Sequence, residues 1–217
     1  SNIRILFEGQ DLRNATLATV SRCGMIWFSE DVLTLDVHYQ RFLRVLRNVP
    51  VDGGDTAQTQ ADVAEVLALQ SKVADTLEPF LEAEGLVTRS LQYAESLFHV
   101  MDYTHGRSIN ALFSMLNQIA RSLAEYNAAH PDFPLSDHQI KEYTTKRFMY
   151  AVMWCLVGDS RGEVREELSR FLAESTTVEL PAAEQGCIID FKVTLPDGEN
   201  HFYLKGGNKL CGDPCAP

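Results

Sequence analysis

The sequence predicts a mainly α-helical chain that begins with the last part of an α/β domain. Residues 3–7 and 25–28 are short apolar runs flanked by polar residues, a pattern typical of strands covered on both faces. From about residue 30 to residue 175, apolar residues instead recur with the period of amphipathic helices. We therefore expect a remnant of an α/β fold in residues 1–29 and a helical domain in residues 30–175.

The first three of six predicted helices carry apolar stripes over residues 32–46, 63–81 and 91–101. The first stripe ends before Pro50 and the second stops at Gly85, as expected of residues that interrupt helices. We expect all three stripes to face a common core.

The last three predicted helices have clear start signals. The fourth follows Gly106 and keeps apolar residues on one face from residue 109 to residue 123. The last turns of the fifth are apolar on all sides, which predicts the centre of the helical core. The fifth and sixth helices are each preceded by capping-box spacing, a Ser followed three residues later by Gln or Glu: Ser136 with Gln139, and Ser160 with Glu163.

Beyond Pro181 the pattern becomes extended again. Apolar residues over 188–195 predict either one strand or a linker, so residues 176–195 are interpreted as a connection to a following domain. Residues 196–217 are rich in Gly, Pro and Cys, and we expect this tail to be disordered.

Composition excludes several classes of partner. A net charge of −11 disfavours binding to nucleic acid and to anionic membrane surfaces, and no apolar run is long enough to span a bilayer. No targeting leader is visible, although we expect the natural N-terminus to lie upstream.

Five cysteines, an odd number mostly far apart, favour the reducing cytoplasm. Cys211 and Cys215 with His201 do not have the spacing of a four-ligand zinc site, so no metal site is expected.

The chain lacks the residues that hydrolyse a nucleoside triphosphate. Hydrolysis needs a glycine-rich loop ending in Gly-Lys-Ser/Thr and an acidic residue that holds magnesium. Residues 205–209, Lys-Gly-Gly-Asn-Lys, have neither the spacing nor the hydroxyl residue and are interpreted as a chance match. We expect the isolated chain not to hydrolyse ATP and to hold no cofactor.

Six segments resemble one known family in the same order. The run ATVSRCGMIWFSEDVL, residues 18–33, resembles the end of the large subdomain of the second AAA+ module of cytoplasmic dynein heavy chains. The later segments resemble that module's small helical subdomain. They are GLVTRSL (85–91), ALFSML (111–116), YNAAHPDFP (126–134), GDSR (158–161) and STTVELP (175–181). The resemblance as a whole covers residues 3 to about 193.

The resemblance implies a fragment of the motor ring of an ATP-driven, minus-end-directed microtubule motor. ATP or ADP with Mg would then bind in the intact motor. The implied partners are neighbouring AAA+ modules of the same heavy chain, with other dynein subunits and microtubules contacted through other parts of the motor. The implied location is the cytoplasm, on the microtubule cytoskeleton.

By the same resemblance, Arg22 in SRCG corresponds to an arginine finger that reaches the γ-phosphate bound by the preceding module. Glu8 falls where the family carries a polar nucleotide sensor, and an acid there would repel phosphate. Arg107 corresponds to the second sensor, which contacts the phosphates of its own module. The residues alone also allow a reading without nucleotide contact, in which Arg22 and Arg107 are solvated arginines and Glu8 is a solvent-facing strand end. Arg161 is a weaker candidate, because helix capping explains Asp159 and Ser160.

Two other function classes remain open. One is a stand-alone helical interaction module without nucleotide chemistry, whose apolar strand faces would need a partner to cover them. The other is an autonomous nucleotide-binding protein, which the missing phosphate loop disfavours.

Overall fold

A computed structural model describes residues 5–9, 11–27, 33–51, 60–178, 180, 187–195 and 202–204. The chain divides into two compact units, Ser1–Leu33 and Thr34–Pro217, and each is described by itself.

The first unit contains one short helix, α1 (Leu17–Val20), capped by the Thr16 hydroxyl, which accepts a hydrogen bond from the Thr19 N–H at 3.3 Å. Residues 5–7 and 25–27 form no strand, so the two predicted strands are wrong for these described residues. The side chains of Leu6 and Phe7 are 96% and 87% exposed. A strand needs neighbouring strands to receive its backbone hydrogen bonds, and no described part of this unit supplies one.

In the second unit, all six predicted helices are present, and the mainly helical fold class is confirmed. A 3₁₀ turn, Glu78–Phe80, extends the second of them. The third ends earlier than predicted, which leaves residues 96–104 as a loop. The helices are α2 (Leu35–Asn48), α3 (Gln60–Leu77), α4 (Leu86–Glu95), α5 (His105–Ala129), α6 (Asp137–Val157) and α7 (Gly162–Ser175).

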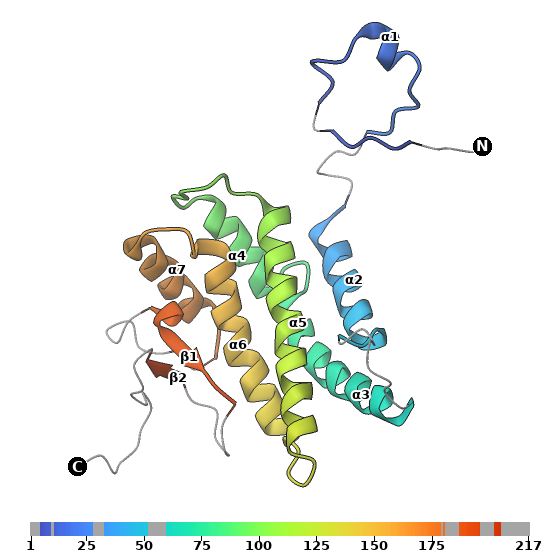
Figure 1. Ribbon diagram of the computed structural model, residues 1–217. Coiled ribbons are helices and arrows are strands. Elements are labelled where there is room, and N and C mark those ends of the chain that lie inside the picture. Colours follow the sequence, from blue (N-terminus) through green and yellow to red (C-terminus); the bar gives the residue numbers. More distant parts are fainter. Residues whose placement is uncertain are drawn as a thin grey trace. The chain divides into compact units, whose positions relative to one another are not determined.

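Helices α5 and α6 run antiparallel through the centre of this unit, with α2 and α3 on one side and α4 and α7 on the other (Figure 1). Helix α6 begins with the predicted capping box, in which Ser136 and Gln139 bond reciprocally to each other's backbone. From Phe148 to Met153, every position of α6 except Tyr150 is buried. The prediction that this apolar helix forms the centre of the core is confirmed, although Trp154 is 48% exposed.

The segment after α7 packs on the core, and of the two alternatives predicted for residues 188–195, one strand or a linker, the structure has a strand. A 3₁₀ turn (Ile188–Asp190) leads into β1 (Phe191–Val193), which pairs antiparallel with β2 (Phe202–Leu204). Ile188 and Phe191 are buried, and this segment packs on α6. Helix α7 ends at Ser175, where the helical tract is predicted to end.

Within the tail of residues 196–217, which is predicted to be disordered, residues 202–204 instead form strand β2 and pair with β1. The remaining residues of the tail, including Cys211, Cys215 and His201, lie outside the described residues.

A buried glutamine fixes the end of α2 against α3. The Gln70 amide donates to the carbonyl oxygens of Leu46 and Val49 at 2.5 and 2.8 Å, and its own oxygen accepts from the Val51 N–H at 3.0 Å. The last carbonyls of a helix have no partner within that helix, so a side chain from α3 supplies one here.

We predict that Gln70→Met lowers the free energy of unfolding by about 3 kcal/mol, because the similar-sized side chain leaves buried backbone groups without partners. Urea denaturation measures the change. The matched control is Gln118→Met on the exposed face of α5, expected to change stability by less than about 0.5 kcal/mol. Equal effects of the two substitutions would contradict the role of Gln70.

Candidate functional site

Two of the three predicted nucleotide-contacting residues lie in the first unit. Arg22 follows α1 in a turn, where its backbone N–H donates to the Thr19 carbonyl at 3.2 Å. Glu8 lies in the extended segment before α1. Both side chains are exposed, and neither forms an ion pair within the described part of the chain.

Arg107 lies in the second unit, in the first turn of α5. The hydroxyl of Thr104 caps this helix and accepts a hydrogen bond from the Arg107 N–H at 3.4 Å. The Arg107 side chain is exposed and forms no ion pair with any described residue. Arg107 thus belongs to a different unit from Arg22 and Glu8.

The loop that leads into Arg107 is anchored by an aromatic residue. The Tyr103 hydroxyl donates to the Leu91 carbonyl at 3.1 Å, and its ring stacks on His99 with centroids 4.5 Å apart. Burial raises the pKa of Tyr103 to about 12. On its other side, the ring meets the edge of His105, whose Nε2 lies 3.5 Å from the Glu95 carboxylate.

The turn between α6 and α7 corrects the capping prediction for Asp159 and Ser160. The N-cap of α7 is Arg161, which makes no side-chain capping bond and is exposed. Ser160 instead donates its hydroxyl to the Phe98 carbonyl at 3.0 Å, and Asp159 accepts from the Met101 N–H at 3.1 Å. Sequence analysis missed these contacts because the Ser160–Glu163 spacing matches a capping box, and nothing in the sequence pairs either residue with a loop about sixty positions earlier.

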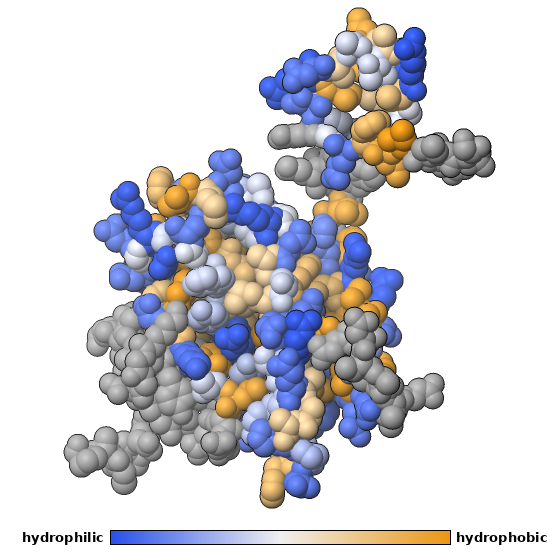
Figure 2. Space-filling view, viewed as in Figure 1, coloured by the Kyte–Doolittle hydropathy of each residue, from blue (hydrophilic) through white to orange (hydrophobic). Residues whose placement is uncertain are grey.

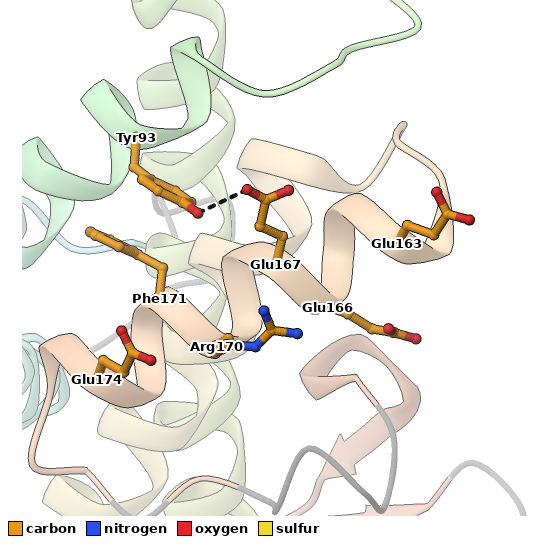
Figure 3. A pocket seen from close by; sticks show the side chains of 7 residues that line it. All are labelled: Tyr93, Glu163, Glu166, Glu167, Arg170, Phe171 and Glu174. Atoms are coloured by element: carbon orange, nitrogen blue, oxygen red, sulfur yellow. Dashed lines mark hydrogen bonds between the residues drawn. The ribbon is translucent and has the colours of Figure 1, made fainter.

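A pocket of about 420 Å³ lies over α7 and the end of α4 (Figure 3). Tyr93 donates to Glu167 at 3.1 Å and stacks on Phe171 with centroids 4.2 Å apart. The remaining lining side chains are three further glutamates and one arginine, so the pocket carries excess negative charge and disfavours phosphate. They are Glu163, Glu166, Glu174 and Arg170.

The described residues offer neither a metal-binding cluster nor a membrane-spanning helix. No cluster of three or more His, Cys, Asp or Glu side chains among them is placed to hold a metal ion. None of their helices combines the length and the apolar character needed to cross a bilayer.

The helical bundle with its short C-terminal hairpin is a lid domain of the AAA class, since the family model "Dynein heavy chain AAA lid domain" matches residues 77–202. The matched range includes the segment after α7 that packs on α6, in agreement with its place in the core.

Relatives extend the match toward the N-terminus. The cytoplasmic dynein heavy chain of Drosophila melanogaster is 44% identical over 203 residues, covering 89% of this chain and 4% of the relative. The Neurospora crassa and Dictyostelium discoideum heavy chains are 39% and 32% identical, each covering 91% of this chain and 5% of the relative. The chain therefore belongs to the dynein heavy chain family, and it spans about a twentieth of the length of these relatives.

We predict that Tyr103→Phe makes stability less sensitive to alkaline pH. A phenol whose pKa is 10.0 when unfolded and about 12 when folded stabilises the fold fully below pH 10.0, and this contribution is lost as the pH rises through about 12. Urea denaturation of both proteins between about pH 9 and pH 12 measures the difference. Tyr150→Phe on α6 is the matched control, and a wild-type pH dependence in the Tyr103 variant would contradict the prediction.

Proposed function

We propose that this chain is the end of the large subdomain and the lid of the second AAA+ module of a cytoplasmic dynein heavy chain. The order of the six resembling segments supports this module, and the relatives named cytoplasmic dynein heavy chains support the motor. In this proposal the chain relays subdomain movements within an ATP-driven microtubule motor, with neighbouring modules as its direct partners. Microtubules and other dynein subunits contact other parts of the motor.

The observation that carries the proposal is Arg107, an exposed cation that pairs with no carboxylate of the described residues, at the start of α5. A positive side chain is unfavourable at a helix N-terminus, where the backbone N–H groups already carry partial positive charge. A phosphate group removes this conflict, because both the N–H groups and the guanidinium donate to it. Arg107 in this proposal contacts the phosphates of ATP or ADP, with Mg, in its own module.

The surface beside Arg107 supports contact with another subdomain. Phe98 and Val100, in the loop between α4 and α5, are 63% and 65% exposed, and Figure 2 shows apolar residues over this loop. Adjacent exposed apolar side chains are typical of interaction sites. A lid that closes over nucleotide would cover this loop.

Arg22 in this proposal stabilises the γ-phosphate of ATP in the preceding module. Its exposed guanidinium is not held by a carboxylate of the described residues, so no ion pair has to break before it reaches a phosphate. Glu8 would repel the terminal phosphate of its own module, which favours a module that holds nucleotide more than it hydrolyses it.

A stand-alone interaction module is the second candidate, and the exposed apolar residues of the first unit favour it. Ile5, Leu6, Phe7, Ile26 and Trp27 all expose more than half of their surface. If the expressed chain is a well-behaved monomer with cooperative unfolding, the stand-alone module gains support. Aggregation that ends when upstream sequence is restored supports the fragment of a motor.

We predict that Arg22→Ala in the intact motor lowers ATP turnover at the preceding module by about 10³-fold or more, as for other arginine fingers supplied by a neighbour. Steady-state ATPase assays measure the change. Arg13→Ala, in the same unit and paired with Asp11 on the surface, is the matched control. Near-normal turnover of the Arg22 variant would exclude the finger.

We predict that Arg107→Ala weakens nucleotide binding to its own module about tenfold, the size expected from losing a charged hydrogen bond to phosphate. Equilibrium binding of a fluorescent ADP analogue to the intact motor tests this. Arg44→Ala, an exposed arginine on α2, should bind as the wild type does. Unchanged affinity in the Arg107 variant would remove this residue from the nucleotide site.

A further inference from the structure

The loop between α4 and α5 is held at both ends by its own residues, while part of its middle is exposed. Its first residues continue the turn of α4, where the N–H groups of Ser96 and Leu97 donate to Tyr93 and Ala94. Farther along, Phe98, Val100 and Met101 are exposed. Thr104 and Arg107 follow directly, so the shape of this loop determines where Arg107 begins its helix.

Two adjacent side chains of the α6–α7 turn bond to the tip of this loop. The Ser160 hydroxyl donates to the Phe98 carbonyl at 3.0 Å, and the Met101 N–H donates to the Asp159 carboxylate at 3.1 Å. The two bonds lie on either side of His99 in the sequence. Together they hold two peptide units of the loop, 98–99 through its carbonyl and 100–101 through its N–H.

His99 fills the space between these two bonds. Its side chain is only 5% exposed, and its Nε2 lies 2.6 Å from the Ala94 carbonyl oxygen. A carbonyl oxygen only accepts, so Nε2 carries a proton and donates. Its Nδ1 lies 3.7 Å from the Asp159 carboxylate, and its ring stacks on Tyr103. The His99 ring therefore lies between the Asp159 carboxylate and the ring of Tyr103, the residue before the N-cap of α5.

The turn that carries Asp159 is itself fixed to two helices. Arg165 of α7 donates to the Gly158 carbonyl at 2.7 Å, where the last carbonyls of α6 need partners. A Cβ atom on Gly158 would collide with the Trp154 carbonyl oxygen, so the close approach at this position requires glycine.

Asp159 holds the loop as an ionised carboxylate. Burial raises the pKa of its carboxyl, but the N–H groups of Met101 and of Asp159 itself, with the nearby His99, outweigh burial and keep that pKa below its ordinary value. The hydrogen bond from Met101 is therefore assisted by charge at neutral pH, which makes it stronger than a neutral one.

We propose that Asp159 and Ser160 are positioning residues that clamp the α4–α5 loop to the α6–α7 turn and so fix the start of α5, where Arg107 lies. The effect of the clamp on nucleotide binding rests on the proposed function of Arg107. The clamp itself involves only contacts within this unit. The clamp gives the Gly-Asp-Ser-Arg segment a role, since Asp159 and Ser160 do not cap α7.

The first test is hydrogen exchange of the expressed chain, compared amide by amide. Asp159→Ala should speed exchange of the Met101 amide and of the first-turn amides of α5 about tenfold or more, while the central amides of α6 exchange as in the wild type. Asp159→Asn keeps an acceptor for Met101 and should restore part of the protection. Asp102→Ala, an exposed carboxylate in the same loop, is the matched control.

A uniform loss of protection, or no change in the loop, would overturn the clamp. If Asp159→Ala does not fold, Ser160→Ala removes the bond to Phe98 and a longer one of 3.5 Å to Asp159, and should give the same local pattern more weakly. A wild-type exchange pattern in a folded Ser160 variant would equally count against the proposal.

The second test places both variants in the intact motor and measures binding of a fluorescent ADP analogue. Asp159→Ala should weaken binding in the same direction as Arg107→Ala, and the double variant should be no weaker than Arg107→Ala alone, because both act through one guanidinium. If Arg107→Ala has no effect while the local exchange pattern appears, the nucleotide role fails and the clamp stands. If Arg107→Ala weakens binding and Asp159→Ala leaves exchange unchanged, the clamp alone fails.

Discussion

The arrangement of the second unit follows from the need to cover helix α6 on almost every side. Its last turns place apolar side chains around the whole circumference, from Phe148 to Val157, and such a helix is stable only when other elements remove it from water. Helices α3, α4, α5 and α7 cover most of its surface, and the segment around β1 adds a further layer. The long antiparallel contact between α5 and α6 is the centre of this packing (Figure 1).

This constraint also determines which loops meet. Because α5 and α6 are antiparallel, the start of α5 and the end of α6 lie at the same end of the bundle. The loop before α5 and the turn after α6 are therefore neighbours, although more than fifty residues separate Met101 from Asp159 in the sequence. Polar groups of these two connections therefore hydrogen-bond to each other: Ser160 to the Phe98 carbonyl, and the Met101 N–H to Asp159. The exposed Arg107 thus follows a loop that is held from outside its own helix.

The parts of the fold that depend on local sequence could be predicted, and the parts that depend on distant partners could not. The capping box of Ser136 and Gln139 and the apolar face of α5 lie within single helices, where spacing alone decides which side chains meet. The same spacing at Ser160 was misleading, since a buried hydroxyl bonds to whichever acceptor packing brings near it. The two predicted strands were wrong for the described residues, because an apolar run forms a strand only beside another strand.

By itself, the sequence determined the helical periodicity, the absence of a phosphate-binding loop and the resemblance to the dynein heavy chains, since each is a property of residue types and their order. Only the tertiary structure decided that the residues after α7 complete the core, that Gln70 closes the end of α2, and that Asp159 holds the loop before Arg107. The physical reason is that a buried polar group must find a partner in three dimensions. That partner is set by how the helices pack, and neighbours in the chain do not specify it.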